Sequence, residues 1–568
     1  MRHLGPKRVL VLVDGVRWVN ESSASGVGGV VDLNTIPVGI IDRIEVLEDG
    51  ASSIYGSDAI AGVVNIITRR DYDGASVSVQ YGQYSEGDGE TGSVDLSFGT
   101  RGERHSFFFG ASYHEQREIF SRDREQSSLP VPGTGLARGS SAIPAGRFIF
   151  TDPDTGTRFD ITPRPGVANP SFDRTQTGCD RTDGFICYAD ATPFNFAEYN
   201  LLLTPNTRKS VFGQMRFDLT DTTTWYLRSL YNNRKSANQA AAEPFFLGSL
   251  APTNFWADNA VFSANNPNNP FGFDLDPNDN MGLIGYRPLE GGPRRFEQDV
   301  DTFYVGTGLE GSFAAGQGAM FWDINLAHST NRAVQTNYGS YNARRLSLAL
   351  GDPAACAAEP GCVPASLIGP GALTPEVLAF IQPVIQDRSE NRLTLFSANL
   401  SGDLFELPAG MAAFATGYEY RKYTGSYTPD GLTLRGEYNG VPSLPTSGEY
   451  DVNEFYGEFS IPLLAGLSFV ERLDLSLAGR YSDYSTSGSE TTAKAACAGR
   501  STTVSCCAAP GRRASGPRPS VSCSAPPAVS TRYSTTRAPA RSRRGLKPTA
   551  PRSACRVATP SPTRRSRC

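Results

Sequence analysis

Apolar and polar residues alternate along most of the chain from residue 73 to residue 490. In residues 211–219, for example, Val211 and Met215 fall on one face and Gln214 falls on the other. A period of two residues indicates β-strands that have one apolar and one polar face. The pattern predicts about eleven such strands, at roughly 75–85, 90–100, 105–120, 208–219, 223–236, 297–313, 319–337, 391–406, 411–427, 449–462 and 470–487.

The connections between the predicted strands alternate in length after the first hairpin. A soluble sandwich or solenoid would have shorter strands and would bury one face of each sheet. A transmembrane barrel needs about ten residues per crossing, with apolar side chains outside, polar ones inside, and short turns at one end only. The strand lengths and the loop asymmetry favour the barrel. Short turns are expected at 101–104, 220–222, 314–318, 407–410 and 463–468, and long loops at 121–207, 237–296, 338–390 and 428–448.

The first 72 residues follow a different pattern. The run at 8–13 (RVLVLV) leads into the turn-forming pair Asp14-Gly15, a run at 40–47 (IIDRIEVL) predicts a buried strand, and a run at 63–69 (VVNIITR) predicts another strand. Together with short helical stretches, these runs predict a small mixed α/β module. The glycines at 26, 28 and 29 follow no βα unit with a distant acidic partner, so we disfavour a nucleotide-binding loop.

Four cysteines form two closely spaced pairs within the long loops: Cys179 with Cys187, and Cys356 with Cys362. Close spacing in exposed loops predicts two local disulfides, formed in an oxidising compartment. The alternatives are free thiols or a metal clip, but no histidine or acidic residue stands at a spacing that supports a metal clip. We favour the disulfides.

Composition narrows the classes of function. The chain has 568 residues, a net charge of -5 and four histidines. Its longest purely aliphatic run, at 9–13, is far shorter than the roughly 20 residues of a membrane-spanning helix, which excludes a helical membrane protein. No charged segment followed by an apolar stretch comes after Met1, so no signal peptide is predicted. Because the sequence shows no triad, nucleophile motif, HExxH motif or clustered Cys/His set in the first 490 residues, we expect no enzyme activity, no metal site and no cofactor.

The charge is unevenly distributed along the chain. From Cys497 onward there are 14 Arg, one Lys and no acidic residue, a net charge of +15, which leaves -20 for residues 1–496. Such a stretch of Arg, Ser, Pro and Ala predicts a disordered basic tail, which we place at 494–568. A basic arm that binds nucleic acid is one interpretation. We favour an out-of-frame translation product, because the composition changes abruptly and Tyr533 is the only aromatic residue there, and so we expect no nucleic-acid partner.

The segment at 41–68, IDRIEVLEDGASSIYGSDAIAGVVNIIT, resembles the second half of the plug domain of TonB-dependent outer-membrane receptors. The turn at 48–50 departs from the family pattern, because it reads Glu-Asp-Gly where a basic residue followed by Gly-Pro is common. The resemblance therefore makes Arg43 the candidate for pairing the plug with barrel carboxylates. The positions that match are Arg43, Glu45, Val46, Ser52, Tyr55, Gly56, Ala59, Gly62, Asn65, Ile66 and Thr68, of which Arg43, Glu45, Ser52, Tyr55, Gly56, Gly62 and Asn65 form the plug signature.

The resemblance covers residues 4–490 and implies a mainly β fold. The implied architecture is an antiparallel transmembrane β-barrel, incomplete at about 11 of 22 strands, with a small α/β plug remnant at the N-terminus. The implied domains are the C-terminal half of the plug at 1–72, the N-terminal half of the barrel at 73–493, and the tail at 494–568. An open sheet of eleven strands exposes two edges, and each unsatisfied backbone group costs several kcal/mol in hydrocarbon, so we expect no insertion as a functional monomer.

The function implied by the resemblance is high-affinity active uptake of a scarce ligand at the cell outer membrane. The ligand would be a siderophore, cobalamin or an oligosaccharide. The implied partners are outer-membrane lipid and the TonB complex, whose contact box is missing from this chain, as is the signal peptide. The alternative is a passive porin or a barrel-type adhesin, which would lack such a plug. An outer-membrane enzyme would need a Ser/His pair, and His105, His114 and His328 have no such neighbours.

Overall fold

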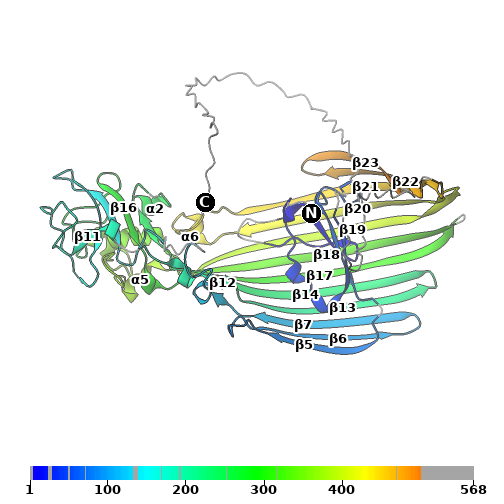
Figure 1. Cartoon of the computed structure of the whole chain (residues 1–568), viewed down its shortest axis with the longest axis horizontal. Helices are drawn as coiled ribbons and strands as arrows, with labels where there is room; N and C mark the ends of the chain where they lie inside the picture. Colours follow the sequence, from blue (N-terminus) through cyan, green and yellow to red (C-terminus); the bar gives the residue numbers. More distant parts are fainter. Residues whose placement is uncertain are drawn as a thin grey trace, which may run out of the picture. The chain divides into compact units, whose positions relative to one another are not determined.

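The computed structural model describes residues 4–22, 29–48, 52–70, 72–131, 139–167, 169–190, 193–250, 252–315, 318–468 and 470–500. Its largest feature is a twelve-stranded antiparallel sheet, which we call the wall, with strand order β23-β22-β21-β20-β19-β18-β17-β14-β13-β7-β6-β5 (Figure 1). The predicted mainly β, antiparallel fold is confirmed. The strands are β5 (Gly74–Gly82), β6 (Thr91–Arg101), β7 (His105–Gln116), β13 (Asn206–Thr220), β14 (Thr223–Ala240), β17 (Arg294–Ala315), β18 (Gly318–Tyr338), β19 (Ile385–Leu407), β20 (Gly410–Thr428), β21 (Thr446–Ala465), β22 (Arg472–Tyr484) and β23 (Gly488–Arg500).

The wall has one strand more than the sequence predicts. β23 pairs with β22 from Gly488 opposite Tyr484 to Arg500 opposite Arg472, and it runs beyond the predicted start of the tail at residue 494. The strand could not be recognised from the sequence, because the small residues of this segment do not alternate in hydropathy. It forms nevertheless, because the backbone makes the hydrogen bonds of the ladder and small side chains do not prevent them. The remainder of the predicted tail, 501–568, lies outside the described residues. Within the described part, β5 and β23 are the two edges of the wall and do not pair with each other.

Burial in the wall is inverted relative to a soluble protein. Val77 and Val79 on β5 are 68% and 70% exposed, whereas Gln214 and Asn232, on β13 and β14, are 2% and 1% exposed. Exposed apolar and buried polar side chains in alternation are typical of a strand with lipid on one side and a polar lumen on the other. Among the described residues, no helix is long and apolar enough to cross a membrane.

The N-terminal module, which we call the plug, is built on a four-stranded sheet of order β2-β1-β4-β3. β1 and β4 are parallel and the other pairs antiparallel, and Asp14 and Gly15 form the turn between β1 and β2 with φ of 49° and 82°. Trp18 stacks on Tyr304 of the wall with ring centroids 4.9 Å apart. The plug therefore shares a hydrophobic core with the wall. The plug elements are η1 (Pro6–Arg8), β1 (Val9–Val13), β2 (Val16–Arg17), η2 (Leu33–Thr35), η3 (Val38–Ile40), β3 (Ile41–Leu47), α1 (Ser52–Tyr55) and β4 (Gly62–Thr68).

The long connections form a third part, which we call the cap, beyond one end of the wall strands (Figure 1). We call that end of the wall the loop end and the opposite end the turn end. The cap contains a five-stranded sheet of order β11-β10-β9-β16-β15 and a separate β8–β12 pair. Its elements are β8 (Ile119–Phe120), η4 (Ser121–Asp123), β9 (Arg147–Thr151), β10 (Arg158–Pro163), β11 (Phe185–Cys187), η5 (Tyr188–Asp190), η6 (Phe196–Tyr199), β12 (Leu201–Leu203), β15 (Phe245–Leu247), α2 (Phe255–Asp258), β16 (Met281–Tyr286), η7 (Leu289–Gly291), α3 (Ala343–Leu350), α4 (Pro353–Ala357), α5 (Pro375–Ile381) and α6 (Gly431–Leu434).

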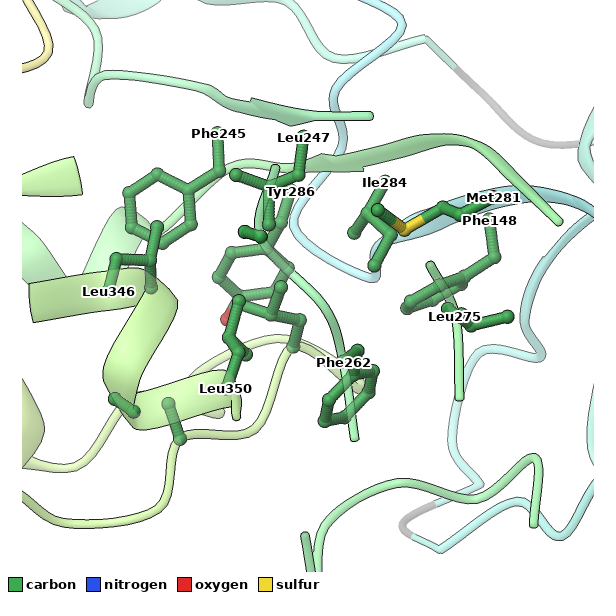
Figure 2. Packing of buried hydrophobic residues seen from close by; sticks show 14 of the residues in the cluster. Phe148, Phe245, Leu247, Phe262, Leu275, Met281, Ile284, Tyr286, Leu346 and Leu350 are labelled. Atoms are coloured by element: carbon green, nitrogen blue, oxygen red, sulfur yellow. The ribbon is translucent and has the colours of Figure 1, made fainter. Parts of the chain in front are cut away.

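The cap has its own hydrophobic core (Figure 2). Side chains from three separate loops fill it, so that the loops bury their apolar residues against one another. Phe148 and Phe150 come from the first loop, Phe271 from the second, and Leu346 and Leu350 from the third. Two disulfides are present in the cap, Cys179–Cys187 with a Cα–Cα distance of 5.0 Å and Cys356–Cys362 with one of 5.3 Å.

Candidate functional site

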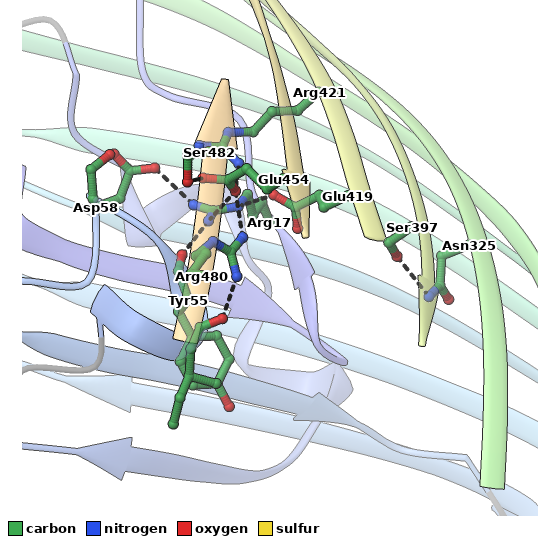
Figure 3. A network of polar contacts seen from close by, with 12 residues as sticks. Arg17, Tyr55, Asp58, Asn325, Ser397, Glu419, Arg421, Glu454, Arg480 and Ser482 are labelled. Carbon is green, nitrogen blue, oxygen red and sulfur yellow. Dashed lines mark hydrogen bonds and ion pairs between the residues drawn. The ribbon is translucent and has the colours of Figure 1, made fainter. Parts of the chain in front are cut away.

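Arg17 lies at the end of β2 and reaches from the plug into the wall (Figure 3). Its side chain is only 3% exposed, with Nη1 2.7 Å from Asp58 of the plug and Nε 2.8 Å from Glu419 on β20. Nη2 donates to the carbonyl oxygen of Tyr55. The fixed fork of donors on a guanidinium allows one side chain to make all three contacts. Arg17 therefore joins two parts of the plug to the wall.

Glu454 on β21 is the buried acceptor beside Arg17. Its carboxylate accepts hydrogen bonds from Arg421 on β20, from Arg480 on β22, and from the Ser482 hydroxyl at 2.6 Å. Arg480 also donates to the carbonyl oxygen of Ile54 in helix α1 of the plug. Because every one of these buried charges has a partner of opposite sign, the site avoids the penalty of an uncompensated charge.

Six charged residues make up this site, and we call them the charge cluster. Three cations face three carboxylates, so the cluster is electrically neutral. A buried ion pair adds little net stability over apolar packing, but it strongly penalises any arrangement that separates the partners. The cluster therefore constrains the position in which the plug docks. Its members are Arg17 and Asp58 of the plug and Glu419, Arg421, Glu454 and Arg480 of the wall.

Gly56 allows the close approach of the plug to the charge cluster. It follows α1 with φ of 83°, and a Cβ there would lie 3.1 Å from Glu454 Oε1 and 3.3 Å from Arg17 Nη2. Glycine is the residue that adopts a positive φ without strain and leaves this space open. The Tyr55-Gly56 pair of the plug signature thus has a physical role: the first residue supplies a carbonyl acceptor, and the second leaves room for the ions.

Further polar contacts hold the plug to other strands of the wall. In the β1–β2 turn, the buried Asp14 has Oδ2 3.4 Å from Nε of Arg228 on β14. Closer to the loop end, Oδ1 of Asn331 on β18 accepts a hydrogen bond from the backbone N–H of Ser22 at 2.6 Å. The plug is therefore held at several points along the inner side of the curved wall (Figure 3), which carries the buried polar side chains and which we call the concave face.

The prediction that Arg43 pairs the plug with the wall is wrong in this structure. Arg43 is 58% exposed, and its ion pairs are with Asp42 at 3.2 Å and Glu45 at 2.9 Å, both on β3 itself. The reason lies in the strand order: β3 and β2 occupy opposite edges of the plug sheet, and β2 is the edge that places Arg17 against the wall.

The other signature residues organise the plug internally. The Nδ2 of Asn65 donates to Glu45 Oε2 at 3.2 Å, and its Oδ1 accepts from the N–H of Gly15 at 3.0 Å. Gly62 has φ of 147°, and a Cβ there would lie 2.3 Å from the backbone carbonyl oxygen at the end of β3. Ser52 begins α1. These residues bring β3, β4 and the β1–β2 turn together.

None of the six members of the charge cluster was predicted from the sequence. A signal was present, because Glu419 and Arg421 stand two residues apart on β20 and therefore share the polar face of a strand whose outer face is apolar. Charged side chains on the face of a strand that lines the lumen indicate that charged groups of another element lie opposite them. The plug partner could not be recognised, since Arg17 is 402 residues away from Glu419 in the chain.

Two cavities lie on either side of the plug. The first, of about 940 Å³, is at the loop end between Asn20 and Ser22 of the plug and the strands β19, β20 and β21, and we call it the outer cavity. The second, of about 530 Å³, is at the turn end between Asp14 of the plug and strands that include β14 and β18, and we call it the inner cavity. The described residues contain no group of three or more His, Cys, Asp or Glu side chains that could hold a metal ion.

Solved structures of similar proteins cover most of this chain. The siderophore receptor PirA from Acinetobacter baumannii is 15% identical, with 88% of this chain and 52% of that chain covered and a TM-score of 0.43. A mutant ferric enterobactin receptor, PfeA from Pseudomonas aeruginosa, in complex with enterobactin is 15% identical, with 87% and 53% covered and a TM-score of 0.45. The ferric citrate transporter FecA is 12% identical, with 85% and 60% covered and a TM-score of 0.36. The chain spans about half the length of the first two proteins.

Two family models match the sequence itself. The model of the TonB-dependent receptor plug domain matches residues 1–63, and the model of the TonB-dependent receptor-like β-barrel matches residues 242–515. Together these matches take in more than half of the 568 residues. They fall on the plug and on the part of the wall that supplies most of the charge cluster. The chain belongs to the TonB-dependent receptor family.

Proposed function

We propose that this chain provides the plug and part of the wall of a receptor that takes up a scarce ligand actively, with the TonB complex supplying the work. The observation that supports this most strongly is the plug, which is fixed to the concave face of the wall by the neutral charge cluster, whose members other than Asp58 are largely buried. A lumen filled by an ion-paired module does not conduct a solute until the module moves.

The proposed location is the outer membrane. The wall exposes apolar side chains such as Val79 and Leu326 on its outer face and buries polar ones such as Gln214 on its inner face. An outer face in contact with lipid hydrocarbon must be apolar, and an inner face that lines an aqueous lumen must be polar. Outer-membrane lipid is therefore a proposed partner of the wall.

The two cavities suggest a route. A ligand would bind in the outer cavity, and the inner cavity would receive it once the plug has moved. Movement must separate Arg17 from Glu419 and must release the carbonyl oxygen of Ile54 from Arg480. Breaking buried ion pairs in a medium of low dielectric is unfavourable, so the step requires work from outside the receptor, for which TonB is the proposed source.

A passive porin or an adhesin is not supported by any observation. A porin needs an unobstructed lumen, whereas here the plug shares a hydrophobic core with the wall. An adhesin would not require a plug that contacts the wall strands β14, β17, β18, β20 and β22.

Ligand accumulation in the bacterium that produces the chain tests the proposal. Cells with the intact coding region and cells in which it is disrupted are given labelled ferric siderophores, cobalamin and oligosaccharides in separate incubations. We expect one of these ligands to accumulate only in cells with the intact region, and the accumulation to stop when TonB is deleted or the proton gradient is collapsed. Accumulation that continues after either treatment would show a passive pore and would contradict the proposal.

A further inference from the structure

The residues of the described part of the chain that line the outer cavity are all uncharged. Asn20 and Ser22 contribute from the plug, Ser389 and Asn391 from β19, and the remaining residues are mostly Ser, Thr, Gly and Tyr from β20, β21 and the loop before β21. Hydroxyl and amide groups both donate and accept hydrogen bonds, so this lining suits a neutral ligand that does the same.

Neutrality is not a general property of the concave face. The inner cavity is lined by the charged residues Asp14, Arg70, Asp221, Arg228, Glu310 and Asp323. The charge cluster, which includes Arg421 on the same strand as Tyr423 of the outer cavity, has its ions paired with one another. The outer cavity is therefore a locally uncharged site within a charged lumen.

Two tyrosines form an aromatic surface in the outer cavity. Tyr423 on β20 is directly opposite Tyr450 on β21 in the ladder, and their rings are stacked with centroids 5.2 Å apart and an angle of 24° between the planes. A tyrosine presents an apolar ring face together with a polar hydroxyl tip. Such a surface matches a sugar ring, which has apolar C–H faces and a rim of hydroxyl groups.

Ser389 provides an independent indication of a ligand. It is 9% exposed and lines the outer cavity, and its buried hydroxyl oxygen has no hydrogen-bond partner among the described residues. An unsatisfied buried hydroxyl is unfavourable, and most such groups in proteins are paired. A ligand hydroxyl in the outer cavity would supply the missing partner.

The rim of the outer cavity is apolar. Val441 and Leu444, in the loop before β21, are 84% and 75% exposed and lie among its lining residues. Exposed apolar side chains beside a polar cavity are typical of a ligand-binding entrance. The volume of about 940 Å³ is at the upper end of the roughly 300–1,000 Å³ that small-molecule sites occupy.

We propose that the outer cavity binds a neutral oligosaccharide, with a sugar ring on the Tyr423–Tyr450 surface and a sugar hydroxyl paired with Ser389. This inference rests on the proposed uptake function and specifies its substrate class. A charged iron complex would find no counter-charge in this lining, whereas a neutral sugar finds hydrogen-bond partners and an aromatic face.

Calorimetric titration of the purified full chain in detergent tests the inference. The probes are three neutral trisaccharides (maltotriose, cellotriose and xylotriose), one acidic trisaccharide of galacturonic acid, a neutral ferric hydroxamate, and ferric citrate. We expect at least one neutral trisaccharide to bind, with an affinity that does not change between low and high salt, because no charge is neutralised on binding. Failure of all three neutral sugars, or tighter binding of either iron complex or of the acidic sugar, would overturn the inference.

Variants locate the binding site. Tyr450→Ala should weaken trisaccharide binding by about tenfold or more, since a central aromatic contact is lost. Ser389→Ala should weaken it by roughly fivefold, the value of one hydrogen bond, and should not lower the thermal midpoint of the chain, because this hydroxyl has no partner to lose. The matched control is Tyr481→Ala, which removes an exposed tyrosine on the outer face of β22 and should bind as the parent does. Binding that is unaffected by both cavity variants would place the sugar elsewhere and contradict the inference.

The result is separable from the proposed function. Accumulation that depends on TonB but concerns a charged ligand would refute the oligosaccharide site and leave active uptake standing. Trisaccharide binding that depends on Tyr450, together with accumulation that does not depend on TonB, would support the oligosaccharide site and refute active uptake.

Discussion

At the scale of single residues, Arg17 and Arg43 show that the position of an arginine in a small sheet determines whether it pairs with the wall or with its own strand. Both arginines lie on edge strands of the plug, but Arg17 is buried against the wall, whereas Arg43 is exposed and pairs with its own strand. Only the first is surrounded by low dielectric, where an ion pair is strong and the loss of one partner is severe. The role expected of Arg43 from the family resemblance is therefore carried here by Arg17.

Replacing Arg17 by alanine should loosen the plug. Asp58 loses its ion pair and Glu419 keeps only Arg421, and removal of one member of a buried ion pair costs about 3–5 kcal/mol. Limited proteolysis of the purified chain should then cleave the plug at lower denaturant concentrations than in the parent. The matched control is Arg43→Ala, for which we expect no change in plug cleavage because its pairs are exposed. Equal effects of the two variants would show that the charge cluster does not hold the plug.

Gly56→Ala should also weaken docking of the plug. The new Cβ would meet Glu454 and Arg17, and the positive φ strains any residue other than glycine, at a cost of about 1–3 kcal/mol. The same proteolysis assay measures the effect. Gly213→Ala on β13 is the control, because a Cβ there has no atom within 4 Å. If the two alanine variants behave alike, the close approach at Gly56 is unimportant.

At the scale of elements, the strands of the wall could be predicted and the cap could not. Alternation with a period of two is a local property, and it gave the correct type for the segments around Met215 and Leu326. The cap core combines Phe150, Phe271 and Leu350 from three loops far apart in the chain, and no local pattern reveals such a core. The strand β23 was missed for a different reason, since its small residues do not alternate in hydropathy.

The cap core should be sensitive to truncation of Phe150. This side chain is 1% exposed and contacts the rings of four other phenylalanines, so Phe150→Ala leaves a cavity that destabilises the cap by about 3–5 kcal/mol. Hydrogen exchange followed by mass spectrometry should show faster exchange throughout the cap, with the wall strands unchanged. Phe255→Ala, which removes a side chain that is 69% exposed, serves as the control. A cap that exchanges as slowly as before would mean that its loops fold independently of this core.

Stability of the cap should depend on pH through Glu243. Burial raises the pKa of this carboxyl from 4.5 to about 7, and one of its two oxygens has no hydrogen-bond partner within the described part of the chain. Because the folded cap binds the proton more tightly than the unfolded chain does, stability is highest below pH 4.5, falls as the pH rises to about 7, and is constant above that. The total loss is roughly 3 kcal/mol. Hydrogen exchange of the cap across this range measures it, and Glu243→Gln should flatten the profile; an unchanged slope in that variant would exclude Glu243 as the cause.

At the scale of the whole molecule, the inverted burial of the wall predicts a dependence on depth. Leu326 lies on the outer face near the middle of β18, and Thr336 lies on the same face near the loop end. An arginine near the bilayer midplane costs about 2–4 kcal/mol, but only about 0–1 kcal/mol near the interface. Leu326→Arg should therefore reduce the fraction of chain recovered in lipid vesicles far more than Thr336→Arg does. Similar recovery of both variants would argue that this face does not contact hydrocarbon.

The distribution of charge within the cluster has a consequence for repeated cycles. The plug contributes one positive and one negative side chain, Arg17 and Asp58, and the wall contributes two of each. Withdrawal of the plug therefore leaves neither the plug nor the wall with an excess charge from the cluster, so no counter-ion has to bind to the wall or leave it. In the proposed uptake cycle, a withdrawn plug therefore returns to the same position without binding or releasing an ion, and no chemical step is needed to restore the site.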